Sequence, residues 1–397
     1  MKYVNIVGYL CIPLAFLVDH QGAARHWDWA PKVVFLLAGL GVIPLAHLMG
    51  QATEQLAEHT GPTLGGLLNA TFGNAAEIII GVIALSKGLN QIVQASLTGS
   101  ILGNLLLVSG AAMVAGGWKR EKQTFSRGAA EANAGLLALA TGAMLLPAIF
   151  HFTAERMHDV KLHEHEEKVS LGTSFVLLAV YALGLLFTLR THKHLFSRTP
   201  AESPEDKPGM GAMGEGWSVK KSLLVLLAAS AGIAVVAERL VGAAEKMAES
   251  LGWNEIFVGV ILLAIIGNAA EHSTAVMLAV RDDMDTAMTI TFQSSIQIAL
   301  FATPFLVLVS WLFHAWGVSP EHHQPLNLVF SPMEVVSVVL TVGIVIVLCI
   351  NGESNWFEGV LLLALYVILG IAFFYIPTHG RGAVQSTGSA TAPVVHP

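Results

Sequence analysis

The sequence contains eleven long apolar stretches with few or no charged residues, and these constrain the fold more than any other feature. A helix needs about 20 apolar residues to cross the roughly 30 Å hydrocarbon core of a bilayer, and only helices or closed barrels satisfy their backbone hydrogen bonds there. Because the runs are long rather than strand-length and alternating, they predict helices. We expect an all-α polytopic membrane protein with eleven transmembrane helices, at residues 3–18, 33–53, 61–86, 89–116, 131–151, 170–190, 220–240, 255–280, 286–313, 332–351 and 356–377.

The composition agrees with a membrane protein and excludes several other classes. Of the 397 residues, 54% are hydrophobic and 12% are charged, about half the charged fraction of an ordinary soluble domain. The formal net charge of −7 offers no basic patch for nucleic acid. A water-soluble enzyme, a nucleic-acid binder and a secreted disulfide scaffold are therefore excluded. Cys11 and Cys349 lie in apolar segments and are expected to be buried free thiols.

A stretch rich in proline and acidic residues divides the apolar part of the chain in two. Residues 191–219 are predicted to be a flexible linker. The predicted organisation is an N-terminal transmembrane helix at 1–19, a first five-helix repeat at 32–190, a second five-helix repeat at 220–377 and a disordered tail at 378–397. The N-terminal stretch also resembles a signal peptide, but no convincing cleavage site follows it.

Lysine and arginine residues in the loops predict the orientation, because they favour the cytoplasmic side. They gather in the loop after the fourth span and at both edges of the linker, whereas the loop 314–331 has none. We therefore expect the N-terminus and the linker 191–219 in the cytoplasm and the C-terminal tail outside. Three basic residues in the loop 152–169 oppose this assignment.

One pentapeptide, Gly-Asn-Ala-Ala-Glu, occurs twice, at 73–77 and at 267–271. The similarity extends upstream, where 52–61 aligns with 243–252, and downstream, where 99–104 aligns with 293–298. Five predicted crossings separate the two copies, so they enter the membrane from opposite sides. This is the inverted-repeat design of secondary transporters, whose substrate site lies near the bilayer midplane between the copies.

The two copies place Glu77 and Glu271 deep in apolar spans. Eighteen charge-free residues precede Glu77 and fifteen precede Glu271, and nine follow each. A carboxylate at the centre of a transmembrane helix costs about 2.5–3.5 kcal/mol on insertion scales. Burial and a neighbouring like charge both favour the protonated form of a carboxylic acid. A divalent cation or two protons would therefore neutralise the pair equally well, which predicts exchange of one for the other rather than a structural polar pair.

The residues around the two glutamates offer further oxygen atoms. Asn74 and Asn268 each lie three residues before a glutamate, and Gln293 and Gln297 lie one turn apart in the ninth span. Such oxygens suit a hard cation such as Ca²⁺, whereas His272 is the one residue that points toward Zn²⁺ or Mn²⁺. The supporting candidates are Gly73, Asn74, Gly267, Asn268, His272, Ser100, Asn104, Gln293, Ser294 and Gln297.

Structural roles remain open for several of these residues. The two asparagines could form only interhelical hydrogen bonds, the serines and Asn104 could simply pack helices, and His272 could relay protons rather than bind metal. The His- and Glu-rich segment 151–168 could bind a transition metal, although such mixed loops are usually just solvated. The cluster His314, His322 and His323 has a weaker claim.

The paired motifs, the second of which continues to Val276, resemble those of the calcium/proton exchanger family of the cation/Ca²⁺ antiporter superfamily. Residues 99–108 and 294–301 are similar to the family's fourth and ninth helices. The resemblance implies one helix plus two five-helix repeats, and Ca²⁺ transport driven by proton flow. It implies that Glu77 and Glu271 are the essential glutamates, that no cofactor is needed beyond the transported ions, and that the protein lies in a prokaryotic cell membrane.

Several other functions are alternatives for a chain with these spans and motifs. An exchanger driven by Na⁺ or K⁺, or one that prefers Mn²⁺ or another divalent cation, fits the same pattern of spans. A passive channel or a metal-sensing receptor is a different class, and a receptor would usually carry a folded soluble output domain. A hydrolytic membrane enzyme is the weakest alternative, because the sequence has neither a GxSxG nor an HExxH motif. The sequence predicts lipid as the surrounding partner and leaves the oligomeric state open.

Overall fold

The computed structural model describes residues 2–192, 216–318 and 324–377. These residues form α-helices joined by short connections, together with one pair of short strands. The helices are α1 (Lys2–Arg25), α2 (Ala30–Phe72), α3 (Ala75–Ser86), α4 (Asn90–Leu102), α5 (Ser109–Gly117), α6 (Arg127–Arg156), α7 (Leu162–Leu186), α8 (Val219–Leu251), α9 (Glu255–Phe257), α10 (Ala264–Val280), α11 (Met284–Gln297), α12 (Thr303–Ala315), α13 (Pro332–Cys349) and α14 (Trp356–Phe374).

Four short π-helical segments continue these helices with a wider turn. They are η1 (Gly103–Val108), η2 (Phe187–Thr191), η5 (Val258–Leu263) and η6 (Ile298–Ala302). η1 joins α4 to α5, and η6 joins α11 to α12. π-helical turns are frequent at functional sites, and η1 and η6 begin within the two segments, 99–104 and 293–298, that the sequence repeat aligns.

Within the described part of the chain, ten helices are long and apolar enough to cross a membrane, and α3 is a shorter apolar helix. The predicted all-helical polytopic membrane fold is therefore confirmed at this level. The ten ranges are Asn5–Arg25, Ala30–Thr60, Asn90–Gly117, Arg127–Arg156, Leu162–Thr191, Val219–Leu251, Glu255–Val280, Met284–Ala315, Pro332–Cys349 and Trp356–Phe374. The count of eleven spans stays a prediction.

Two predicted span boundaries are wrong near the first motif. The predicted spans 33–53 and 61–86 do not form two separate helices, because residues 30–72 form the single helix α2. The chain then turns at Gly73 and Asn74 before α3 begins. The helix continues through Gly61 and Pro62, whereas the backbone departs from helical dihedrals at Asn74, with φ −102° and ψ 27°.

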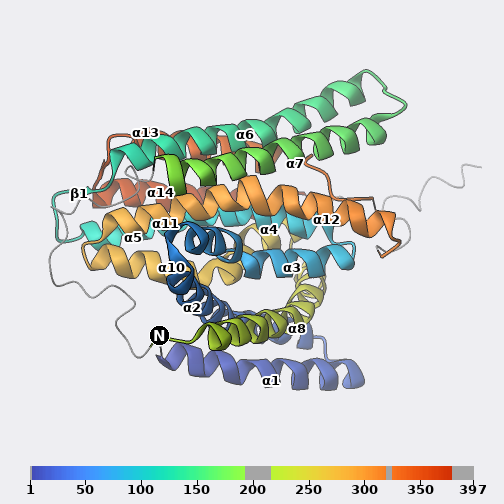
Figure 1. Cartoon of the computed structure of the whole chain (residues 1–397). Coiled ribbons are helices and arrows are strands. Elements are labelled where there is room, and N and C mark those ends of the chain that lie inside the picture. Colours follow the sequence, from blue (N-terminus) through green and yellow to red (C-terminus); the bar gives the residue numbers. More distant parts are fainter. Residues whose placement is uncertain (1, 193–215, 319–323, 378–397) are drawn as a thin grey trace, which may run out of the picture.

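The predicted ends of three other spans are also wrong. The segment 151–168 is mostly helical rather than a loop, because α6 runs to Arg156 and α7 begins at Leu162. This α6–α7 hairpin extends beyond the neighbouring helices (Figure 1). The seventh predicted span, 220–240, continues as α8 to Leu251 and ends at Gly252, whose φ of 66° is left-handed. Glycine adopts that conformation without a steric penalty. The predicted tail 378–397 and most of the predicted linker lie outside the described residues.

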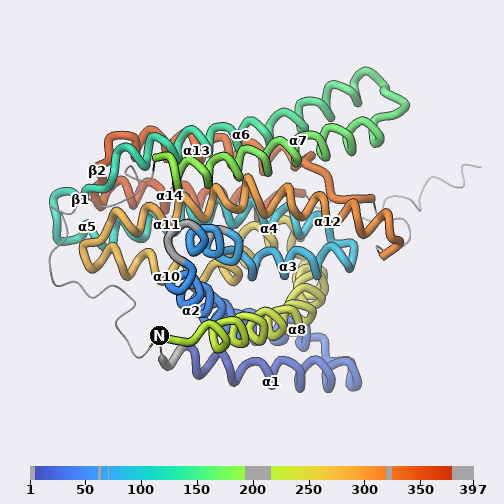
Figure 2. Tube along the Cα trace, in the orientation of Figure 1, coloured from blue at the N-terminus to red at the C-terminus, as the bar shows by residue number. Residues whose placement is uncertain are grey.

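The helices lie in successive groups from one side of the molecule to the other. α6, α7 and α13 lie along one side and α1 along the opposite side (Figure 1). α2 and α8 pack against each other between α1 and the remaining bundle (Figure 2). An ion pair between Asp19 Oδ2 and Arg239 Nε, 3.1 Å apart, links α1 to α8. The helices of the two motifs, α3 and α10, lie between this group and α4, α5 and α11.

A short antiparallel strand pair closes one end of the bundle. β1 (Gln123–Thr124) pairs with β2 (Glu353–Ser354), with Gln123 opposite Ser354. Lys122 Nζ lies 2.8 Å from Glu353 Oε1 beside this pair. The pair ties the connection between α5 and α6 to the connection between α13 and α14, so that both halves of the chain are joined at this end.

Candidate cation-binding site

The first motif lies at a break between two helices. α2 ends at Phe72, and Asn74 occupies the N-cap position of α3 with φ −102° and ψ 27°. Glu77 therefore lies in the first turn of α3. A helix N-terminus presents free backbone N–H groups and the positive end of the helix dipole, so this position favours a negative charge on Glu77.

The second motif lies inside a continuous helix. Gly267, Asn268 and Glu271 belong to α10, which follows η5 without a break. Asn268 is fully buried, and it lies one helical turn before Glu271 on the same face. The same pentapeptide thus has two backbone conformations, one broken and one continuous.

The structure brings the two motifs into contact. A Cβ atom built on Gly267 would lie 3.5 Å from Glu77 Oε1 and 3.6 Å from Glu77 Cγ. Gly267 is one turn before Glu271, and the two carboxylates are close enough to interact electrostatically. Glu77 therefore faces the surface of α10 that also carries Glu271.

Each motif asparagine contacts a serine of the other sequence copy. Asn268 Nδ2 donates to Ser100 Oγ at 2.8 Å, and Ser294 Oγ lies 3.0 Å from Asn74 Oδ1. Ser100 and Ser294 are equivalent positions in the repeat. These crossed contacts are related by the pseudo-symmetry of the sequence, and all four side chains are buried.

Further contacts break this pseudo-symmetry. Asn74 Nδ2 donates to Gln297 Oε1 at 2.6 Å, whereas the equivalent of Gln297 in the first copy is Gly103. Asn104 Nδ2 donates to Ser294 Oγ at 3.0 Å and to Asn268 Oδ1 at 3.4 Å, whereas the equivalent of Asn104 is Ile298.

Only one glutamate is anchored through this serine pair. Ser294 Oγ lies 2.6 Å from Glu271 Oε2. The equivalent serine, Ser100, instead accepts from Asn268. The candidate oxygens around the two carboxylates are thus arranged differently on the two sides.

Two of the predicted site residues, Gln293 and His272, contact residues other than the two glutamates. Gln293 Nε2 donates to Oδ1 of Asn133, a buried residue of α6, at 2.9 Å. The sequence analysis did not single out Asn133. Its polar amide lies two residues into a predicted apolar span, and this could have indicated a contact with another helix. The ring of His272 lies beside Gly103, where a Cβ atom would be 3.8 Å from His272 Cε1. His272 Nε2 is buried without a hydrogen-bond partner among the described residues.

The donor set fits a hard cation carried as substrate. Two carboxylates are joined by amide and hydroxyl oxygens of Asn74, Ser294 and Gln297, which are ligands that Ca²⁺ accepts. Among residues 2–192, 216–318 and 324–377, no three side chains of the His, Cys, Asp and Glu type come together in a metal-holding group. The arrangement therefore does not resemble a soft-metal centre with several imidazole or thiolate ligands.

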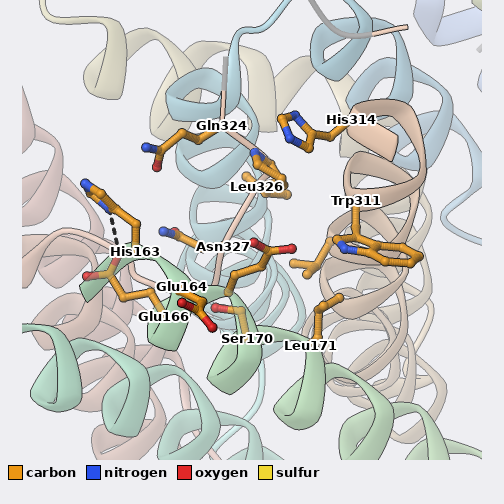
Figure 3. Close-up of a pocket in the computed structure, with 13 residues that line it drawn as sticks. His163, Glu164, Glu166, Ser170, Leu171, Trp311, His314, Gln324, Leu326 and Asn327 are labelled. Atoms are coloured by element: carbon orange, nitrogen blue, oxygen red, sulfur yellow. Dashed lines mark ion pairs between the residues drawn. The ribbon is translucent and has the colours of Figure 1, made fainter. Parts of the chain in front are cut away.

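The His- and Glu-rich segment borders a separate cavity of about 280 Å³ (Figure 3). The cavity lies between the start of α7, the end of α12 and residues 324–327. Two of its acidic side chains have partners: Glu166 lies 2.5 Å from His151 Nδ1 and 3.5 Å from His163 Nδ1, and Glu164 lies 2.6 Å from Lys168 Nζ. Among the described residues of this segment, no three His, Cys, Asp or Glu side chains come together in a group that could hold a metal ion. His314 lines the cavity, and His322 and His323 lie outside the described residues.

A further buried carboxylate belongs to a helix cap. Glu334, 3% exposed, accepts from Ser331 N at 3.0 Å and from Thr98 Oγ1 at 3.2 Å. Ser331 and Glu334 form a capping box at the start of α13. The sequence pattern Ser-x-x-Glu before an apolar run could have identified this role. Glu334 is thus satisfied by structural contacts.

Comparisons with known proteins agree with this architecture. The sodium/calcium exchanger protein family model matches residues 31–190 and 221–375. A Ca²⁺/H⁺ antiporter of Synechocystis sp. is 45% identical over 368 residues, which cover 89% of this chain and 94% of that protein. A vacuolar calcium ion transporter of Schizosaccharomyces pombe is 42% identical over 380 residues, with 95% and 87% covered.

A solved structure has a similar fold. A structure of native YfkE superposes with a TM-score of 0.74 at 37% identity, and the match covers 94% of this chain and 100% of that one. The family match covers most of the chain, and the identity to these relatives also extends far beyond the two motifs. The chain therefore belongs to the sodium/calcium exchanger protein family, and within it to the calcium/proton exchangers that its paired motifs indicate.

Proposed function

We propose that this protein is a secondary antiporter that exchanges Ca²⁺ for H⁺ by alternating access, with Glu77 and Glu271 binding the cation and protons in competition. The observation that carries this proposal is the packing of Glu77 against Gly267, one turn from Glu271. Two carboxylates held this close within membrane helices need a compensating positive charge. A divalent cation or a pair of protons supplies it.

The names of the relatives support the substrates. The Synechocystis protein is a Ca²⁺/H⁺ antiporter, and a 40% identical protein of Bacillus subtilis has the same description. The carboxylate, amide and hydroxyl oxygens near the two glutamates are consistent with Ca²⁺. Mn²⁺ or another divalent cation remains a substrate that the same donors would accept.

The unequal conformations of the two repeats support alternating access. In the first copy the helix continues through Gly61 and breaks after Phe72, whereas in the second it ends at Gly252 and continues through Gly267. If the two copies exchange these conformations, the face of the site open to water also exchanges, because the repeats are inverted. This is the change that a carrier needs.

The proposed layout is one helix at 1–19 followed by inverted repeats at 32–190 and 220–377, which gives eleven spans. The two ranges of the family match support this division. The site then lies near the bilayer midplane, the linker 191–219 and the N-terminus face the cytoplasm, and the protein resides in the cell membrane. Proton flow into the cytoplasm would drive Ca²⁺ out.

Transport by the purified protein in proteoliposomes tests the proposal. With an acidic lumen, Ca²⁺ should enter the vesicles, and a protonophore should stop it. An imposed Na⁺ or K⁺ gradient without a pH gradient should drive no uptake, and a panel of divalent cations should show which compete. Uptake that follows Na⁺ and ignores the protonophore would contradict proton coupling, and Ca²⁺ flux without any coupled ion would indicate a channel.

A further inference from the structure

The hydroxyl group of Ser294 has more partners than it has hydrogens. It lies 3.0 Å from Asn104 Nδ2, 2.6 Å from Glu271 Oε2 and 3.0 Å from Asn74 Oδ1. A hydroxyl donates one hydrogen bond and accepts up to two. Because the amide nitrogen of Asn104 can only donate, the single Ser294 hydrogen is left for two acceptors.

When Glu271 is ionised, as cation binding requires, the shorter of these two contacts takes the hydrogen. Hydrogen bonds to a carboxylate are shorter and stronger than neutral ones, and the Glu271 contact is shorter by 0.4 Å than the Asn74 contact, as 3.0 Å less 2.6 Å. Asn74 Oδ1 then faces the site without another donor among the described residues. The amide nitrogen of Asn74 donates to Gln297 Oε1 at 2.6 Å, which fixes this orientation.

The equivalent groups of the other copy are used differently. Asn268 Nδ2 donates to Ser100 Oγ at 2.8 Å and to the Ala264 carbonyl at 2.9 Å. Asn268 Oδ1 faces Asn104 Nδ2 at 3.4 Å. The Asn268 amide is therefore held at both its nitrogen and its oxygen, and no carboxylate of the described residues forms a hydrogen bond with Ser100.

We propose that Ser294 is the positioning residue that fixes an asymmetric ligand set, in which Glu77, Glu271 and Asn74 face the cation while Asn268 and Ser100 only crosslink helices. This inference rests on the proposed function. Ser294 aims Glu271 and leaves the Asn74 oxygen available, and Asn104 holds Ser294 in place. The two copies of the motif are thus unequal in cation binding although their sequences are identical.

The equivalent serines provide a matched comparison. Ser294→Ala should raise the Ca²⁺ concentration for half-maximal uptake in proteoliposomes by about tenfold, the loss expected for one hydrogen bond to a charged group. The maximal rate per folded protein should change much less. Ser294→Thr keeps the hydroxyl and should restore the half-maximal concentration to within about threefold of the wild type. Ser100→Ala should change this concentration less than Ser294→Ala does and should lower the melting temperature more.

A second pair of variants keeps the test decisive if Ser294→Ala folds poorly. Asn74→Ala should raise the half-maximal Ca²⁺ concentration more than Asn268→Ala does, measured on the folded fraction of each. Equal shifts for the paired variants, or no rescue by Ser294→Thr, would overturn the inference. Wild-type protein that exchanges Ca²⁺ for H⁺ while these pairs behave equally would refute the asymmetry alone, whereas wild-type protein without exchange would refute the proposed function.

Discussion

The Glu77 carboxylate packs directly against Gly267, since a Cβ atom there would lie 3.5 Å from Glu77 Oε1. The absence of a side chain at this point of α10 lets the carboxylate of one motif reach the helix of the other. It also leaves Glu77 without an apolar cover on that side. The identity of this one residue therefore controls how closely the two acidic groups approach.

Gly267→Ala should fold but transport poorly. A contact of 3.5 Å is ordinary van der Waals packing, so the new methyl group is tolerated, but it covers Glu77 Oε1 and displaces whatever ion or water would bind there. We expect uptake to fall about tenfold with little change in the yield of monodisperse protein. Gly99→Ala provides the contrast, because its Cβ would overlap the Val260 carbonyl oxygen and should reduce the folded yield itself. Wild-type transport by Gly267→Ala would argue against the close approach of the two motifs.

Glu334→Ala should affect stability and leave exchange intact. Glu334 completes the capping box of α13 and accepts from Thr98, and loss of such contacts costs about 1–2 kcal/mol. We expect a lower melting temperature but unchanged Ca²⁺ affinity per folded protein. If this variant instead lost transport while remaining folded, Glu334 would also act in transport. That result would contradict its assignment as a purely structural group, distinct from Glu77 and Glu271.

The sequence predicted the chemistry of the site better than its backbone. The identity of the two pentapeptides was enough to single out Glu77 and Glu271, because two carboxylates in apolar spans are too unfavourable to arise without compensation. The same identity could not predict that the helix breaks at Gly73 and not at Gly267. That difference depends on how α2 and α10 pack in the whole molecule, and local sequence holds no information about it.

Hydrogen bonds between residues far apart in the chain also could not be predicted from the sequence. Nothing local to Gln293 indicates that its amide meets Asn133, 160 residues earlier in the chain. The helical extension of the α6–α7 hairpin was missed for a different reason, since its His, Glu and Lys residues are polar all round and suggested a loop. Ion pairs spaced three or four residues apart, such as Lys168 with Glu164, stabilise a helix in such a segment.

Asn133 and Gln293 should be energetically coupled. Asn133→Ala removes the acceptor for the Gln293 amide, which is otherwise met at 2.9 Å. If Gln293 helps to line the ion pathway, each single variant should reduce transport, and the double variant should be little worse than either, because both remove the same contact. Additive effects in this double-mutant cycle would show that the two residues act separately.

The turn between α6 and α7 should loosen only in acid. The hydrogen bond from His165, together with that from the Lys161 amide, lowers the pKa of Asp159 below its usual value. A lowered folded-state pKa gives stabilisation that is present above the unfolded value of about 3.9 and is lost as the pH falls through the folded value. Protection of the Lys161 amide from exchange, corrected for its intrinsic rate, should therefore be constant above about pH 4 and should fall below that pH. Asp159→Asn should remove this pH dependence, and a wild-type turn that is equally protected at lower pH would contradict the assignment.

The central claim is that Ca²⁺ and protons compete for Glu77 and Glu271, and proton release on Ca²⁺ binding tests it most directly. Ca²⁺ is added to the purified protein in weakly buffered detergent solution, and the pH is recorded. Wild-type protein and Glu334→Gln should both acidify the solution, whereas the Glu77→Gln, Glu271→Gln double variant should bind no Ca²⁺ and release no protons. Ca²⁺ binding without proton release by the wild type, or equal release by the double variant, would contradict the account.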